Sequence, residues 1–144
     1  MKRKNSIRRS GFTLIEVVVV IVILLTLATI ATPLYMNYLK DANKKAAVVG
    51  MNNLKVPISK FRIDMGRYPT EIEELVNSPS DDEDNKWSGP YLEKVPKDPW
   101  GSEYKINVPG DEDYEYDIVC FGPDKEEGTD DDIVEHGNRS GAKN

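Results

Sequence analysis

Two groups of acidic residues carry the chemistry that this sequence suggests. Glu16 lies within residues 12–34, a run whose only other polar residues are four threonines. A carboxylate near the centre of a bilayer costs about 2.5 to 3.5 kcal/mol, so such residues usually face a partner or a cavity. The second group is the segment GPDKEEGTDDDI at residues 122–133, which places six carboxylates around a central glycine.

Glu16 would be neutralised by a positive charge arising close to it. Cleavage after Gly11 would make Phe12 the new N-terminus, four residues before Glu16. Four residues span one helical turn, about 6 Å, so the new α-amino group could pair with the carboxylate. The pair would form within one chain or, in an assembly, between Glu16 of one subunit and Phe12 of the subunit before it. The alternative is that Glu16 lies at the membrane interface and stays partly hydrated.

The segment 122–133 is a candidate calcium site, because calcium prefers hard oxygen ligands at about 2.3 to 2.6 Å. A divalent cation would also relieve the repulsion between its crowded carboxylates. The spacing differs from an EF-hand, which needs a glycine at loop position six and a glutamate at position twelve. A solvated acidic loop is the alternative. The candidate ligands are Asp124, Asp130, Asp131 and Asp132, with Glu126 and Glu127 nearby.

The element that must position Glu16 is a membrane-spanning helix. Residues 12–34 would cover about 34 Å as a helix, which exceeds a hydrocarbon core of roughly 30 Å. Residues 1–11 contain five basic and no acidic residues, whereas the remainder contains 14 basic and 25 acidic residues. The positive-inside bias therefore predicts a cytoplasmic N-terminus and an exported C-terminal part. A cleaved secretory signal is the alternative, although the apolar run is long for one and no clear small-x-small cleavage site follows it.

Composition argues against several classes of function. The exported part carries a net charge of −11, which disfavours nucleic acid as a partner. Cys120 is the only cysteine, so no intrachain disulfide can form, and we expect its side chain to be buried in an apolar strand. His136 is the only histidine, and without a second imidazole or a convergent polar site no catalytic triad is expected and the chain should not be an enzyme.

Pro33 should kink or loosen the helix by removing one backbone hydrogen bond, and the helix can then continue. Pro57 should cost about 3 kcal/mol inside a helix, which predicts a bend or break near residues 53–57. Gly66 should end the helix, and Thr70 with Glu73 predicts a capping box that opens a short helix through about Asn77. The apolar residues that recur every three or four positions, and so predict one buried stripe, are Ala42, Ala46, Gly50, Leu54, Ile58, Phe61 and Met65.

Two β-prone runs, residues 103–108 and 114–121, predict an antiparallel hairpin. Residues 78–85 should form a solvated acidic loop, and residues 138–144 a loose tail. The fold class is therefore α+β, with a long N-terminal helix, membrane-spanning in its first half, packed on a small antiparallel sheet. The strand residues expected to face the helix are Tyr104, Ile106, Tyr116, Ile118 and Cys120.

Several segments resemble the type IV pilin-like superfamily. Residues 11–16, GFTLIE, followed by an apolar helix, are similar to the class III leader of type IV pilins and pseudopilins. Four later segments are similar in content and order to the major pseudopilins of type II secretion, and the resemblance covers residue 11 to about residue 133. These segments are GRYPT at 66–70, GPYL at 89–92, PKDPWGSEY at 96–104, and GPD with GTDDDI within 122–133.

The resemblance implies a processed subunit with a pilin-like fold. A prepilin peptidase would cut after Gly11 and methylate Phe12, and Glu16 would support assembly. The chain would divide into a removed cytoplasmic leader (1–11), a transmembrane and assembly helix (12–34), a periplasmic globular domain (35–137) and a flexible tail (138–144). The mature chain would cross the inner membrane once before it enters a homopolymer.

The resemblance also implies a cofactor and partners. Calcium would be held by the side chains of Asp124, Asp130 and Asp132 together with backbone carbonyls, although Lys125 stands where a glycine is common. The fibre would drive export of folded proteins together with minor pseudopilins and an inner-membrane secretion platform. The alternatives are a type IV pilin subunit for adhesion, motility or DNA uptake, a membrane-tethered enzyme, and a calcium-binding module on a simple anchor.

Overall fold

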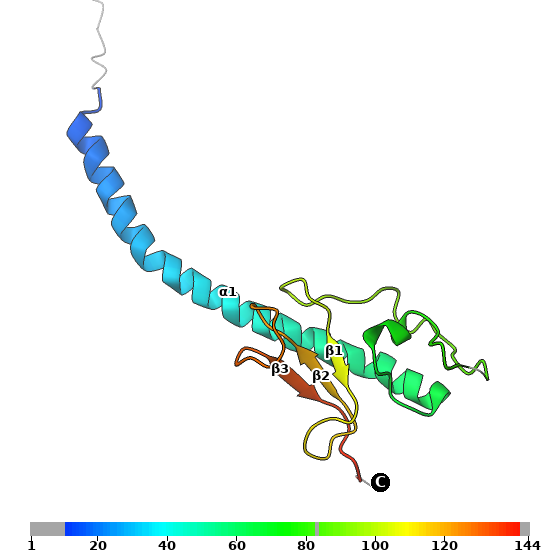
Figure 1. Cartoon of the computed structure of the whole chain (residues 1–144). Coiled ribbons are helices and arrows are strands. Elements are labelled where there is room, and N and C mark those ends of the chain that lie inside the picture. The colour runs from blue at the N-terminus through cyan, green and yellow to red at the C-terminus, as the bar shows by residue number, and fades with distance from the viewer. Residues whose placement is uncertain (1–10, 83, 142–144) are drawn as a thin grey trace, which may run out of the picture. The chain divides into compact units, whose positions relative to one another are not determined.

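The computed structural model describes residues 11–82 and 84–141 (Figure 1). Most of the predicted leader, residues 1–10, and the last residues of the predicted tail, 142–144, lie outside this range. The chain divides into two compact units, Met1–Leu39 and Lys40–Asn144, which are described separately. In chain order the elements are the α-helix α1 (Leu14–Met65), the 3-10 helix η1 (Ile72–Leu75), and the strands β1 (Lys105–Asn107), β2 (Asp117–Cys120) and β3 (Ile133–His136).

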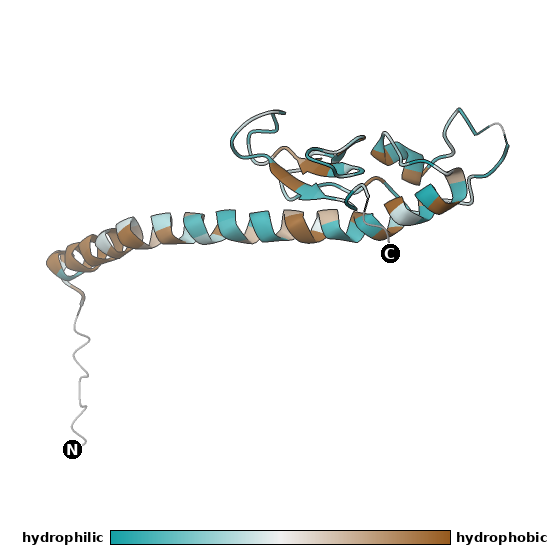
Figure 2. Cartoon of the chain, turned by 90° about the horizontal axis from the view of Figure 1, so that it is seen from below, coloured by the Kyte–Doolittle hydropathy of each residue, from teal (hydrophilic) through white to brown (hydrophobic). Residues whose placement is uncertain are grey.

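The first unit contains the apolar half of α1, which is long and apolar enough to cross a membrane (Figure 2). Its side chains are exposed throughout residues 11–38. Thr26, Thr29 and Thr32 each donate a hydroxyl hydrogen bond to a backbone carbonyl of the preceding turn, at 2.7 to 2.8 Å. These bonds satisfy the hydroxyls within the helix, so the threonines are compatible with an apolar solvent.

The second unit contains one antiparallel sheet with strand order β1-β2-β3. Strands β1 and β2 pair with Ile106 opposite Ile118, which confirms the predicted hairpin. Strand β3 pairs with β2, with Val134 opposite Val119, and the sequence did not predict it. Its four residues, IVEH, are too short and too polar to show a strand period before their pairing partner is known.

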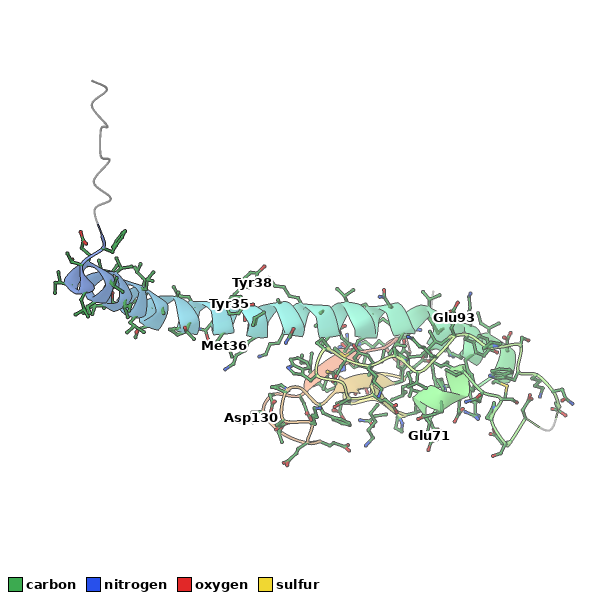
Figure 3. The ribbon with its side chains drawn as sticks, turned by 90° about the horizontal axis from the view of Figure 1, so that it is seen from above. Tyr35, Met36, Tyr38, Glu71, Glu93 and Asp130 are labelled. Carbon is green, nitrogen blue, oxygen red and sulfur yellow. The ribbon has the colours of Figure 1, made fainter. Side chains whose placement is uncertain are left out.

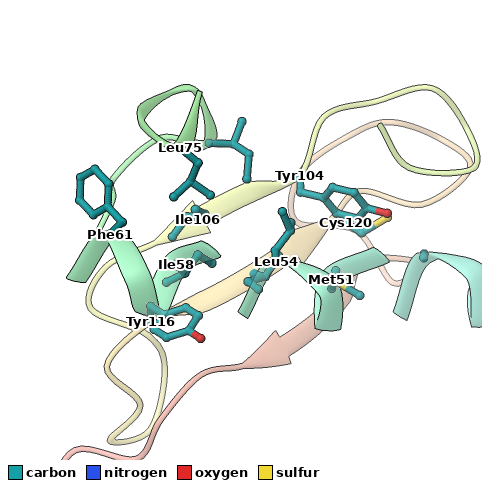
Figure 4. Packing of buried hydrophobic residues seen from close by; sticks show 12 residues of the cluster. Met51, Leu54, Ile58, Phe61, Leu75, Tyr104, Ile106, Tyr116 and Cys120 are labelled. Carbon is teal, nitrogen blue, oxygen red and sulfur yellow. The ribbon is translucent and has the colours of Figure 1, made fainter. Parts of the chain in front are cut away.

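The core lies between the C-terminal half of α1 and one face of the sheet (Figure 4). All five strand residues predicted to face the helix are buried there, with exposed fractions of 4 % or less. This burial confirms the α+β arrangement, since the helix and the sheet each cover the apolar face of the other. The remaining core residues are Ala47, Met51, Leu54, Ile58 and Phe61 from α1, and Ile72 and Leu75 from η1.

The predicted break near residues 53–57 does not form, because α1 continues through Pro57 to Met65. Pro57 is buried on the helix face that meets the sheet. Burial of this face offsets the lost backbone bond, since tertiary packing supplies most of the stability of helices in proteins. The helix then ends as predicted at Gly66, which has φ +75° and donates its N–H to Arg62 O at 2.9 Å.

The buried stripe of α1 differs from the predicted one at its N-terminal end. Ala47 and Met51 are fully buried, whereas the predicted Ala46 is exposed. Gly50 is half-buried beside Tyr104, and a Cβ at this position would overlap the Tyr104 hydroxyl. Glycine is therefore required for the close approach of the helix to the sheet.

Thr70 pairs with Glu74 rather than with Glu73, so the predicted capping box is wrong. The Thr70 hydroxyl donates to Glu74 Oε1 at 2.7 Å, and the predicted helix is reduced to the single turn η1. Arg67 holds the other Glu74 oxygen at 2.7 Å and also binds Asp81 at 2.8 Å. Asp81 of the loop 78–85 therefore forms an ion pair with Arg67, whereas this loop was expected to be only solvated.

A pair of neighbouring alanines tests the position of the buried stripe. We expect Ala47→Leu to lower the free energy of unfolding by about 1 to 3 kcal/mol, because an enlarged side chain overpacks a filled core. Ala46→Leu is the matched control and should change it by less than about 0.5 kcal/mol, as exposed substitutions usually do. Denaturant unfolding followed by circular dichroism measures both, and equal effects would contradict this packing.

Cys120 provides a second test of the core. Its thiol is buried and donates to Asp98 Oδ2 at 3.2 Å, and burial raises the pKa of the Cys120 thiol to about 11. At pH 8 the thiolate fraction should be roughly a hundredfold lower than in the unfolded chain. We therefore expect negligible alkylation of Cys120 by iodoacetamide in the folded protein and rapid alkylation in denaturant, measured by mass spectrometry. Rapid labelling of the native chain would show that the strand is not packed as described.

Candidate functional site

Glu16 folds back onto the start of α1. The backbone N–H and the hydroxyl of Thr13 both donate to Glu16 Oε2, at 2.8 and 2.9 Å, and the backbone N–H of Glu16 donates to Thr13 Oγ1 at 3.3 Å. This reciprocal arrangement is a capping box, and a cap of this kind contributes about 1 kcal/mol. The sequence signal for this cap is Thr13 followed three residues later by glutamate, and it was not among the predicted features.

Gly11 and Phe12 precede α1 and have no regular secondary structure. Phe12 is 83 % exposed, and a Cβ placed on Gly11 would have none of the described atoms within 4 Å. In the uncut chain the nitrogen of Phe12 is part of a peptide bond, so the predicted amine does not yet exist. Glu16 Oε1 accepts no hydrogen bond within the part of the chain that the structure describes. The geometry therefore leaves the bond after Gly11 accessible and one carboxylate oxygen available.

The carboxylates of the loop 122–133 mainly bind the loop's own backbone. Asp124 Oδ1 accepts from the N–H of Glu126 at 2.9 Å, and Asp132 Oδ2 accepts from the N–H of Gly128 at 2.8 Å. Asp131 accepts from the Thr129 hydroxyl at 2.8 Å, and this bond lowers the pKa of the Asp131 carboxyl. These bonds shape the loop between β2 and β3.

The predicted calcium ligands do not converge on one point. Within residues 11–82 and 84–141, no three histidine, cysteine or acidic side chains are arranged to hold a metal ion. Asp130 is exposed at the edge of the loop (Figure 3). Asp132 is different, because its Oδ1 is buried and has no hydrogen-bond partner among the described atoms. A buried carboxylate oxygen without a donor is an unusual feature that a bound cation would satisfy.

Lys125 is held in a backbone conformation that favours glycine. Its φ is +63°, within the left-handed region that residues with a Cβ seldom adopt. The resemblance placed a glycine at this position, and glycine adopts a positive φ without steric cost. The neighbouring Gly122, with φ +71°, packs closely against the backbone of Asp131, which fixes the base of the loop.

A contact between the exposed His136 and the buried Asp117 was not predicted from the sequence. Asp117 is 2 % exposed, and its Oδ1 lies 2.7 Å from His136 Nδ1 where β2 pairs with β3. Its Oδ2 accepts from the N–H of Asp111 at 2.7 Å, and the His136 ring stacks on Tyr114. The pair joins the loop between β1 and β2 to β3. No sequence signal marked it, because the two residues meet only through the register of the sheet.

The first residues of the predicted tail contact the sheet region. The N–H of Glu115 donates to Asn138 O at 2.8 Å, and Arg139 forms an isolated β-bridge with Tyr114. The Arg139 guanidinium also lies over the Tyr114 ring, 5.7 Å from its centroid. Residues 138–140 therefore have defined contacts, since the N–H of Ser140 also donates to Asp113 O.

Two family descriptions match this chain. Residues 34–136 match the type II secretion system protein G family, and residues 7–32 match the prokaryotic N-terminal methylation motif. The second match contains Gly11, Phe12 and Glu16, and the first contains the acidic loop.

Individual relatives agree with these matches. The type II secretion system core protein G of Aeromonas hydrophila is 40% identical over 88% of this chain and 91% of its own length. That of Escherichia coli K12 is 36% identical over 90% and 92%. The crystal structure of the major pseudopilin from the type 2 secretion system of enterohaemorrhagic Escherichia coli matches with a TM-score of 0.57 at 28% identity, covering 69% of this chain and 90% of that one. The chain therefore belongs to the type II secretion system protein G family, the family of the major pseudopilin.

Proposed function

We propose that this chain is the major structural subunit of a type II secretion pseudopilus. It polymerises into a periplasmic fibre that drives export of folded proteins. The observation that carries the proposal is the placement of Glu16 at the head of an apolar helix, five residues after an accessible Gly11. One of its carboxylate oxygens accepts no hydrogen bond from the described residues. The family match supports a structural role rather than catalysis.

In the proposed assembly step, Glu16 exchanges its hydrogen bonds with Thr13 for an ion pair with the N-terminal amine of a neighbouring subunit. In the uncut chain the Thr13 cap satisfies Oε2, which makes the carboxylate tolerable before assembly. Cleavage after Gly11 by a prepilin peptidase, with methylation of Phe12, creates a positively charged N-terminus. Pairing of Glu16 with that amine on the neighbouring subunit removes an uncompensated charge from lipid and sets the axial register of the fibre.

The same proposal assigns a location and partners. The mature chain crosses the inner membrane once through the apolar half of α1, with its acidic C-terminal part in the periplasm. Minor pseudopilins and an inner-membrane secretion platform complete the assembly, in agreement with the family of the chain.

We further propose that the loop 122–133 binds calcium. Asp132 supports this proposal with its buried, unpartnered Oδ1, and Asp124 and Asp130 belong to the same loop. These three side chains, with backbone carbonyls, would hold the ion, and calcium would neutralise their crowded charges. Lys125 makes the loop less negative. A site of 10⁻⁴ to 10⁻³ M affinity, typical of extracellular modules, would still fill at roughly millimolar calcium.

Substitution of Glu16 by glutamine separates charge from capping. Glutamine can also occupy the third position of a capping box, so Glu16→Gln should leave α1 intact but remove the charge that pairs with the Phe12 amine. We expect electron microscopy to show no fibres of this variant. Thr13→Val is the matched control, because it loses the hydroxyl but keeps Glu16, and it should assemble.

Mass spectrometry of the membrane-resident Glu16→Gln chain provides the processing control. It should show loss of residues 1–11 and one added methyl group on Phe12, which excludes a defect in cleavage. Fibres equal to those of the parent chain would contradict the proposed role of Glu16 in assembly.

Calcium binding is tested by thermal unfolding with calcium and with EDTA. Calcium at 100 times its Kd should stabilise the parent chain by about 2.7 kcal/mol. Asp132→Asn should abolish most of this gain, because the buried oxygen loses its charge. Asp111→Asn, an exposed aspartate outside the loop, is the control and should keep the gain. The proposal fails if the parent chain unfolds at the same temperature under both conditions.

A further inference from the structure

A row of exposed residues follows the face of α1 opposite the core. We call it the outer ridge, and its members recur at steps of three and four, which keeps them on one face over about 27 Å. Val49, Val56 and Ile63 within it are 59%, 62% and 80% exposed. The outer ridge consists of Lys45, Val49, Asn53, Val56, Lys60 and Ile63.

The outer ridge is apolar and positively charged. It contains no acidic residue, and neither Lys45 nor Lys60 forms an ion pair within residues 11–82 and 84–141. Other lysines of the same unit do pair, for example Lys55 with Glu135 at 3.1 Å. The outer ridge thus combines three exposed apolar side chains with two lysines that form no ion pair within the described residues. Burial of the apolar side chains in an interface would be favourable.

A groove with the complementary character lies between η1 and β1. It has a volume of about 460 Å³, and its apolar lining is the half-buried Phe121 together with Ile72, Tyr104 and Ile106, which are only 3 to 4 % exposed. Lys105 also lines it and pairs with Glu127. We call it the acidic groove, because Glu71, Glu73 and Glu103 also line it, are exposed, and form no ion pair within the described residues. Glu71 projects from the side of the globular unit that is remote from α1 (Figure 3).

We propose that the outer ridge of one copy of this chain docks in the acidic groove of the next copy. The inference rests on the proposed fibre and names the surfaces that join its globular units. Apolar side chains of the outer ridge would meet Phe121, and the ridge lysines would meet the glutamates at the rim, so the opposite charges of the two surfaces select this partner. A nucleic acid would be repelled by the groove, because both are negatively charged.

Two different surfaces make this contact heterologous. A ridge on one side and a groove on another cannot satisfy each other within one subunit, so each copy offers an unoccupied groove to the copy that follows. Repetition of a heterologous contact that does not close produces a helical filament. The inferred contact therefore gives a fibre its direction, in addition to the register set by Glu16.

Charge reversal and its rescue test the contact in the full-length, membrane-processed chain. Lys45→Glu with Lys60→Glu reverses the ridge, and Glu71→Lys with Glu73→Lys reverses the groove. Either pair should lower the sedimentable polymer by about tenfold, since like charges would then face each other across the interface. All four substitutions together restore opposite charges and should return polymer to within about twofold of the parent chain.

Matched controls separate this interface from charge and folding effects. Lys44→Glu with Lys94→Glu changes the net charge by the same amount at exposed lysines outside the ridge, and it should assemble normally. Circular dichroism of each chain in detergent should show unchanged helix content, which makes loss of polymer attributable to the interface.

The outcomes distinguish this inference from the proposed function. If Glu16→Gln blocks assembly while both reversals assemble normally, the fibre proposal stands and the interface is overturned. Reversals that each reduce polymer but do not rescue each other also overturn the pairing of these two surfaces. Normal polymer with lost export would assign the surfaces to a different partner and overturn the inference as well. A parent chain that forms no fibre at all would contradict both proposals.

Discussion

One helix with two kinds of surface is the constraint on which this protein depends. The first half of α1 is apolar on every side, and its threonine hydroxyls bond to its own carbonyls. The second half has one buried face, centred on Met51 and Ile58, and a solvent-facing remainder. A helix satisfies its backbone hydrogen bonds internally, so one backbone is stable both in lipid and in water. Side chains alone therefore decide which part leaves water and which part meets the sheet.

Glu16 has two physical roles that the sequence places on one residue. As the third residue of α1 it completes a capping box with Thr13, and a negative charge there is also favoured by the helix dipole. As a carboxylate in an apolar run, it would be stabilised by pairing with a positive charge. The cap explains how the charge is tolerated in the uncut chain, and the proposed pairing with Phe12 explains why a neutral capping residue would not serve equally well.

The globular unit uses most of its half-buried and buried acids as local acceptors. Asp98 accepts from the N–H groups of Trp100 and Ser102, and Asp82 accepts from those of Lys86 and Trp87. These bonds hold turns that have few apolar contacts of their own. The loop 122–133 follows the same pattern but has more carboxylate oxygens than donors, as the buried Oδ1 of Asp132 shows. This excess is the physical basis of the proposed calcium site.

The sequence alone determined the features that depend on neighbouring residues. It predicted the apolar half of α1, the helix end at Gly66, the hairpin of β1 and β2, and burial of Cys120, because composition and local periodicity encode them. Tertiary structure decided the rest. It carried α1 through Pro57, buried Ala47 in place of Ala46, and paired Asp117 with His136, since each outcome depends on packing against segments distant in sequence. Sequence patterns record which residues prefer burial, but only the assembled sheet decides which of them meet.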